Sequence, residues 1–138
     1  MAQVADIEIK NNFDEVEEAF KEKIEAWLLA VGEDAASTAA EIPNFPVDTG
    51  RLRNSITAVS EGHQSQPNKY GGAHAEPEDY QPHGQPEPNS VYIGTNVDYA
   101  IYHELGTSTG IPAKHFIQFG ASAHSRKYKQ MLEEQLKQ

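Results

Sequence analysis

Residues 13–41 read FDEVEEAFKEKIEAWLLAVGEDAASTAAE and carry the most regular apolar pattern of the chain. Placed at about 100° per residue, eight apolar side chains fall within an arc of about 120°, which predicts an amphipathic helix. Pro43 and Pro46 forbid its continuation, so we expect the helix to end near Glu41. The eight side chains are Phe13, Val16, Phe20, Ile24, Trp27, Leu28, Val31 and Ala35.

The segment before this helix has a different pattern. Residues 7–10 alternate between apolar and charged side chains, which predicts a short strand. Asn12 is then a natural N-cap for the helix, with Glu15 three residues on in the capping-box position. Residues 1–10 lack the basic start and apolar centre of a secretory signal.

The stretch that follows the helix, residues 46–56, reads PVDTGRLRNSI. Asp48 is expected to cap a short helix over residues 49–54, because its carboxylate would face the free amides of the first turn. Gly50 would let that turn approach another part of the backbone closely. We expect a strand over residues 55–60.

Residues 61–90 differ in composition from the rest of the chain. They contain five prolines, four glycines and three histidines, and no Val, Ile, Leu, Met or Phe. Such a segment cannot bury enough apolar surface to offset the entropy lost on ordering. We therefore expect a long exposed loop that orders on meeting a partner, with Tyr70 and Tyr80 as its candidate contacts.

The last third of the chain returns to regular structure. Alternation at residues 91–95 predicts a strand, and residues 98–105 predict a short helix that Gly106 ends by adopting positive φ. A final helical segment is expected after Pro112, with Gly120 as the point where it bends or breaks.

We expect the notable side chains of the two short helices to hold the fold in shape and not to catalyse a reaction. Tyr99 and Tyr102 lie three residues apart on one helical face, so both are expected to pack on the sheet. Arg51 and Arg53 point to different sides of their helix. Glu104 is a candidate ion-pair partner for either arginine.

The composition suits one small domain over residues 1–138. The chain has no cysteine, so it can hold neither a disulfide nor a cysteine-rich zinc site. No apolar run approaches the roughly 18 to 20 residues that span a bilayer, so we expect no membrane contact. Together the elements predict an α+β fold, in which a long N-terminal helix, a short helix and a C-terminal helix flank a small antiparallel sheet.

Charge is abundant and unevenly spread. The formal net charge of -10 argues against a protein that grips phosphate backbones and favours a self-repelling monomer in free solution. Residues 13–41 hold nine acidic residues and two lysines, whereas the tail from Lys114 holds five basic residues and two glutamates. These opposite charges could pair within one subunit or between neighbours, although charge runs more often form a solvated face.

The sequence leaves two further functions open, each from a different class of protein. The net charge suggests an acidic inhibitor or DNA mimic, although such a mimic has no need for glycine and aromatic motif spacing. A metal-dependent hydrolase could use His103, Glu104 and His115. However, the second histidine of a helical zinc motif would fall at position 107, where Thr107 stands. Polar loop filler is the simpler interpretation of His63, His74 and His83.

Three blocks in order resemble the tail-component family of long-tailed bacteriophages, typified by gene product ten of a lambdoid phage. The first is residues 46–56, and the second is residues 91–107, a strand followed by Tyr-Ala, an aromatic, Glu, an apolar residue, Gly and Thr. The third is residues 112–117, where His115 replaces a proline of the family pattern. The residues that we expect to form the structural motifs or the subunit interface are Asp48, Thr49, Gly50, Arg51, Leu52, Arg53, Tyr99, Tyr102, Glu104, Gly106 and Thr107.

The resemblance implies a structural virion protein with no catalytic residue, metal or cofactor. Its place would be the phage neck, as a tail-completion or head–tail joining subunit in a hexameric ring. Its partners would be the connector or stopper on one side and the tail terminator or tail tube on the other. DNA would pass through the ring without specific binding, and the subunit would be made in the bacterial cytoplasm.

Overall fold

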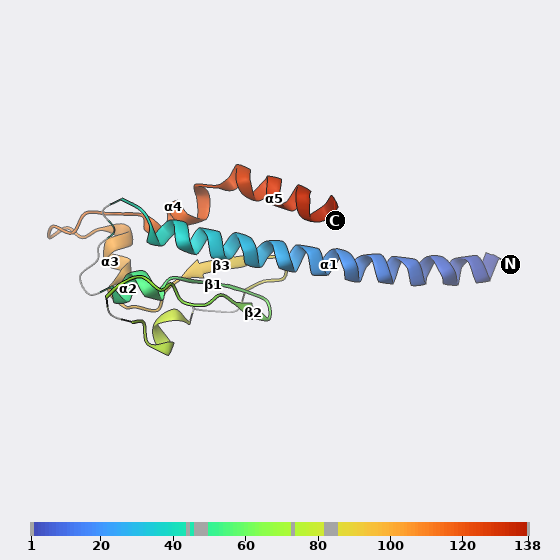
Figure 1. Ribbon diagram of the computed structural model, residues 1–138, viewed down its shortest axis with the longest axis horizontal. Coiled ribbons are helices and arrows are strands. Elements are labelled where there is room, and N and C mark those ends of the chain that lie inside the picture. The colour runs from blue at the N-terminus through green and yellow to red at the C-terminus, as the bar shows by residue number, and fades with distance from the viewer. Residues whose placement is uncertain (1, 44, 46–49, 73, 82–85, 138) are drawn as a thin grey trace.

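The chain folds into an elongated α+β structure built along one helix (Figure 1). The computed structural model describes residues 2–43, 45, 50–72, 74–81 and 86–137, with side chains from residue 17 onward. A small sheet lies on one side of the C-terminal half of helix α1 (Ala2–Ala40). Helices α4 (Phe116–Ser122) and α5 (Ser125–Lys137) lie on the other side. The predicted fold class is confirmed.

Helix α1 ends at Ala40, one residue before the predicted end, but it begins much earlier than expected. The strand predicted at residues 7–10 is wrong, because α1 starts at Ala2 and places Asn12 inside the helix. Two apolar residues at alternate positions are too short a pattern to specify a strand. The surrounding alanine, glutamate and lysine residues favour a helix, and no glycine or proline interrupts them.

The sheet has three antiparallel strands in the order β2-β1-β3. The central strand β1 (Thr57–Ser60) pairs with β3 (Val91–Gly94) across the long loop and with β2 (His63–Gln64) across a tight turn. Gly62 in that turn has a φ of 80°. Both predicted strands are confirmed, each slightly shorter than expected, and β2 is an addition that its sequence did not reveal.

Small residues let α1 approach both of its neighbours closely. A Cβ added to Gly32 would lie 2.6 Å from the Cβ of Ala58 in the sheet. On the opposite side, a Cβ added to Gly120 of α4 would lie 2.6 Å from both the Ala35 carbonyl oxygen and the Ala39 Cβ. The predicted interruption of the final helical segment lies at residues 123–124, between α4 and α5, and not at Gly120: α4 continues through this glycine, which serves a helix–helix contact.

The main core gathers where the C-terminal end of α1 meets α2 (Arg51–Ser55), α3 (Ala100–Leu105) and α4. Phe116 is fully buried there, and its ring meets the ring of Phe45 edge to face at 5.2 Å between centroids. The other core residues are Ala36, Ala39, Ala40, Leu52, Ile56, Val97 and Ala100.

The close contact at Gly120 predicts the effect of one added methyl group. Gly120→Ala should lower the free energy of unfolding by about 1–3 kcal/mol, because α1 and α4 must separate to accommodate it. Urea unfolding followed by circular dichroism measures the change. The matched control is Gly71→Ala, where an added Cβ meets nothing within 4 Å and the expected change is within about 0.5 kcal/mol. Equal stability of the two variants would contradict this packing.

Candidate functional site

The first motif forms helix α2, which starts two residues later than predicted. The helix starts at Arg51, and its N-cap residue is Gly50 with a left-handed φ of 95°. A side chain is strained at this φ, so the glycine is needed for the turn itself. Leu52 then points into the core and is 2% exposed. Asp48, the expected N-cap, and Thr49 beside it lie outside the described residues.

Arg51 fastens the long loop to this helix. Its guanidinium donates through Nε to Oδ2 of Asp79 at 2.7 Å and through a second nitrogen to Oδ1. Asp79 is buried in the 3-10 helix η1 (Pro77–Tyr80) and also accepts a hydrogen bond from the main-chain N–H of Glu76. The hydrogen bonds from Arg51 outweigh the effect of burial and lower the pKa of Asp79. The expected pairing of an arginine with an acidic neighbour is confirmed for Arg51, with an unexpected partner.

Arg53 points the other way and closes the end of α1. Its Nε donates to the Ala40 carbonyl oxygen at 2.8 Å, which satisfies an acceptor that the helix end leaves open. Its guanidinium carbon lies 4.2 Å from the ring centroid of Tyr70 and 5.9 Å from that of Phe45. This cation–π stacking ties a loop aromatic to the core.

The loop is therefore anchored by polar contacts rather than fully exposed. The predicted exposure is wrong for Asp79 and for Ser65, whose hydroxyl accepts the main-chain N–H of Ala58. Tyr70 donates its hydroxyl to Glu41, and burial together with that contact raises its pKa to about 12.

The two tyrosines expected to meet a partner are engaged within the chain. The main chain of Tyr70 exchanges two hydrogen bonds with the buried amide of Asn54. The Tyr80 carbonyl oxygen accepts from Thr57 in β1 and from Gln64 in β2. Their contact with a partner stays a prediction.

The second motif shapes helix α3 and the turn after it. Gly106 ends α3 with a φ of 77°, as predicted, and its N–H donates to the Tyr102 carbonyl oxygen. An added Cβ at Gly106 would lie 2.9 Å from the main-chain nitrogen of Ala113. Thr107 closes the following turn, because its N–H and hydroxyl both bond the main chain of Ile111.

Glu104 caps helix α4. Its two carboxylate oxygens accept the main-chain N–H groups of Ile117 at 2.8 Å and Gln118 at 3.1 Å. A carboxylate at a helix N-terminus satisfies free amides and opposes the positive end of the helix dipole. The predicted pairing of Glu104 with Arg51 or Arg53 is wrong.

His115 joins the same contact. Its N–H donates to the Glu104 carbonyl oxygen at 3.1 Å, and its φ of 50° lies in the left-handed region. Proline fixes φ near −65°, so a proline at this position could not adopt this conformation.

The exposed face of α3 was not foreseen. Tyr99 precedes the first helical residue and packs on the core, whereas Tyr102 is 52% exposed, so its predicted packing on the sheet is wrong. Ile101 and Leu105 are also exposed, at 56% and 62%. Their spacing of four places them on one helical face, opposite the buried Ala100. We call Ile101, Tyr102, Leu105 and the nearby exposed Ile111 the α3 end.

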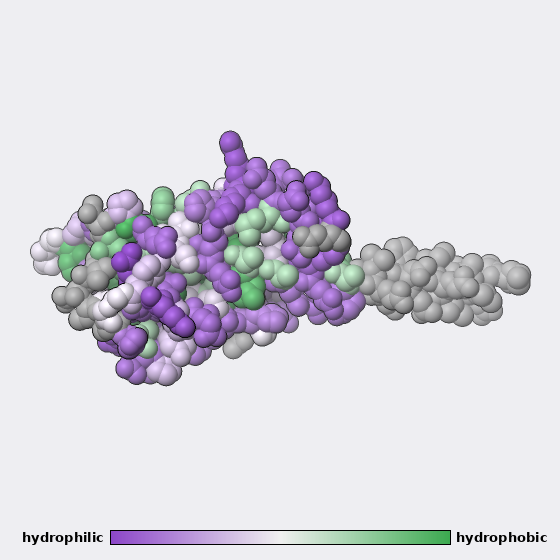
Figure 2. Space-filling view, in the orientation of Figure 1, coloured by the Kyte–Doolittle hydropathy of each residue, from purple (hydrophilic) through white to green (hydrophobic). Residues whose placement is uncertain are grey.

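The α3 end stands out on the surface. Figure 2 shows apolar colour at the end of the molecule that holds α3 and the turn after it, and a second apolar patch over the middle of the body. Contiguous exposed apolar surface on a small protein marks an interaction site. The sequence offered one signal, because a six-residue helix with apolar residues on more than one face cannot bury them all.

The basic tail pairs with α1 within one subunit, as one of the two interpretations predicted. Asp34 accepts hydrogen bonds from Lys127 at 2.9 Å and Tyr128 at 2.8 Å, and His124 Nδ1 lies 2.9 Å from it. Trp27 adds a bond from its Nε1 to the Tyr128 carbonyl oxygen at 2.7 Å. Burial alone would raise the pKa of Asp34, but the hydrogen bonds with Lys127, His124 and Tyr128 outweigh burial and lower this pKa to about 2.

The residues of the hydrolase alternative do not come together as a metal site. Both oxygens of Glu104 accept main-chain N–H groups, and the ring of His103 packs edge-on against Tyr99. Within the described part of the chain, no three His, Asp or Glu side chains gather to hold a metal ion. His83 lies outside that part.

The comparisons agree with this arrangement. The family described as "Bacteriophage HK97-gp10, putative tail-component" matches residues 7–106. The chain belongs to this family of phage tail components. The match spans both glycine motifs and the long loop, and it ends at Gly106, before the third block. No curated protein and no solved structure matches the chain.

Family membership makes this tail component a structural protein of the virion that works with other phage tail proteins. The geometry fits that role, since the motif residues hold loops, helix ends and turns in place. No helix of the described residues is long and apolar enough to cross a membrane.

The cap made by Glu104 can be tested by truncation. Glu104→Ala should lower the free energy of unfolding by about 1–2 kcal/mol, and Glu104→Gln by less, because the amide keeps an acceptor but loses the charge. Chemical denaturation measures both. Glu134→Ala removes an exposed glutamate with one surface ion pair and should change stability by no more than about 0.5 kcal/mol. A loss as large in this control would refute the cap.

The low pKa of Asp34 predicts acid sensitivity. Its pKa is depressed in the folded state, so its contribution is complete above about pH 4 and is lost as the pH falls toward 2. When the pH is lowered from about 6 to about 3, the free energy of unfolding should therefore fall less for Asp34→Asn than for the unmodified chain. Denaturant titrations at the two pH values give this difference. An unchanged difference would mean that Asp34 does not carry this linkage.

Proposed function

We propose that this tail component is a neck subunit of a long-tailed phage, acting in tail completion or head–tail joining. It forms a ring, hexameric by the family resemblance, between the head connector and the tail tube. The observation that carries the proposal is the α3 end, an exposed apolar surface fixed in place by the Glu104 cap and by Gly106.

A fixed apolar surface suits assembly better than catalysis. Apolar side chains exposed to water gain free energy when a neighbouring protein covers them. The main-chain bonds between α3 and the start of α4 run from Lys114 to His103 at 2.7 Å and from His115 to Glu104 at 3.1 Å. They keep the surface from rearranging, so less order has to be gained on binding.

The charge explains how assembly would be confined to the virion. A net charge of -10 makes free subunits repel one another and favours a monomer in solution. A connector or stopper, or a tail terminator or tail tube end, would concentrate subunits and make weak lateral contacts sufficient. Acidic residues lining the ring would let DNA pass without binding.

The family match favours this role over the two rivals. A DNA mimic or acidic inhibitor needs the charge but not the glycine turns, which here fix α2 and α3. A metal-dependent hydrolase needs a free Glu104, whose oxygens cap α4 instead.

The proposal is tested with a phage that carries a nonsense codon in this gene. Lysates should contain separate filled heads and tails by electron microscopy, and purified protein added to them should restore joined, infectious particles. The double variant Tyr102→Ser with Leu105→Ser should fold normally, since both side chains are exposed, yet restore few particles. Leu136→Ser, which removes an exposed leucine from α5, is the matched control and should restore them fully. Normal virions without the protein would end the proposal.

A further inference from the structure

The C-terminal third carries a positive surface on an acidic protein. Residues 105–132 contain no aspartate or glutamate but include Lys114, Arg126, Lys127 and Lys129. Lys127 is engaged by Asp34, whereas Arg126 and Lys129 are exposed. This basic strip follows α4 and α5 along the side of α1 that faces away from the sheet (Figure 1).

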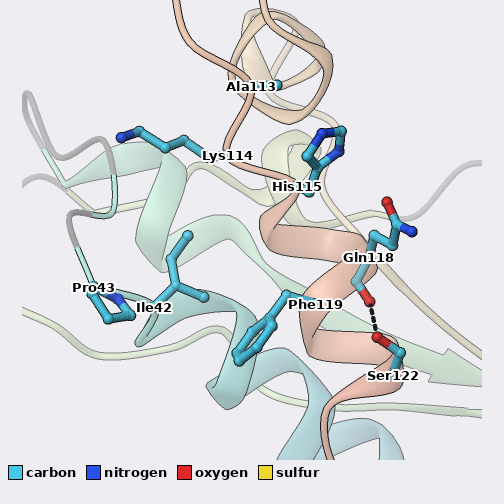
Figure 3. A pocket seen from close by; sticks show the side chains of 8 residues that line it. All are labelled: Ile42, Pro43, Ala113, Lys114, His115, Gln118, Phe119 and Ser122. Carbon is cyan, nitrogen blue, oxygen red and sulfur yellow. Dashed lines mark hydrogen bonds between the residues drawn. The ribbon is translucent and has the colours of Figure 1, made fainter.

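A hollow opens at the α4 end of the basic strip. It has a volume of about 510 Å³ between α4 and the residues that follow α1. In Figure 3, Lys114 and Phe119 extend to the side of α4 on which Ile42 and Pro43 lie. Phe119 is 48% exposed, so the α4 hollow has an apolar wall and a lysine at its rim. It suits an apolar side chain flanked by acidic groups.

The same chain carries such a surface at its other end. Residues 14–25 of α1 include six acidic residues and two lysines. Glu17, Glu18 and Phe20 are exposed there, and Phe20 presents 52% of its surface. We call residues 14–25 the acidic half of α1. It joins an exposed aromatic ring to negative charge, which is the complement of the α4 hollow.

The two surfaces cannot meet within one subunit. Phe20 and Ala40 are separated by 20 residues of continuous helix, which is roughly 30 Å at 1.5 Å per residue. The α4 hollow lies beside the C-terminal end of α1, whereas Glu18 and Phe20 of the acidic half lie beside Glu61 and Pro88, further toward the N-terminus of the same helix (Figure 1). Any contact between them therefore joins two copies.

We propose that the acidic half of α1 in one subunit docks into the α4 hollow of the next, with Phe20 against Phe119 and Glu18 near Lys114. This inference rests on the proposed ring and names its lateral interface. Two different surfaces on each subunit give a head-to-tail contact, which is the kind that closes into a ring. The occupant is a second copy because the complementary charge and the exposed ring are both present on this chain.

The interface is tested by cross-linking, for which a chain without cysteine is well suited. The variant with Glu18→Cys and Lys114→Cys is treated with a short bis-maleimide at high protein concentration, where the weak lateral contacts form between otherwise monomeric subunits and are trapped. A ladder of dimers, trimers and larger species is expected, because each subunit can be linked on both sides. The matched control pairs Lys114→Cys with Glu78→Cys, an exposed glutamate of η1 that makes the same charge change.

The outcomes separate the interface from the function. A ladder in the first variant that exceeds that of the control supports the interface. Ladders of equal strength, or a dimer formed by Lys114→Cys alone, overturn it by indicating random or face-to-face contact. The complementation assay with the unmodified protein tests the ring's role independently, so the interface can fail while the proposed function stands.

Charge exchange gives a second measurement. Glu18→Lys and Lys114→Glu should each lower the yield of joined particles roughly tenfold or more, because like charges would then face each other. A mixture of the two variants should recover the yield, since acidic and basic surfaces meet again in an alternating ring. A mixture no better than either variant alone overturns the pairing. Circular dichroism checks that both variants fold.

Discussion

The structure depends on how closely other elements can approach the C-terminal half of α1. The sheet packs against one side of this half of the helix, and α4 packs against the other side. Gly32 and Gly120 have no room for a Cβ, and Ala35 and Ala39 supply the facing surface. A larger side chain at any of these places would separate a layer from the helix and remove its dispersion contacts.

Polar contacts hold in place the segments that the small apolar core does not stabilise. Arg51 with Asp79 and Arg53 with Tyr70 hold a loop that has no Val, Ile, Leu, Met or Phe to bury. Glu104 holds the start of α4 in the same way. Buried or half-buried polar groups stabilise only when their hydrogen bonds are satisfied, and these groups find their partners far away in the sequence. The motif residues of the family are thus used to fix shape.

The features that were predicted correctly from the sequence are those that depend on residues close together in the chain. Helix α1 has a long apolar period, β3 has alternating side chains, and Gly106 has the position of a helix stop, and these three features were found. The start of α1 was missed because Ile7 and Ile9 form too short a pattern. The partners of Arg51 and Glu104 were missed because both lie across long loop closures that periodicity cannot reveal. The exposure of Ile101 and Leu105 depends on how α3 packs against α4, which no local pattern encodes.

The bonds between the end of α3 and the start of α4 have a geometric consequence. They join the α3 end and the α4 hollow in one rigid unit, so a subunit presents both surfaces at a fixed inclination. In the proposed ring, the inclination between the acidic half of α1 and the α4 hollow would decide whether successive copies close a circle or climb into an open spiral. The hydrogen bonds around residues 103–118 would then fix the direction in which the α3 end of each copy faces.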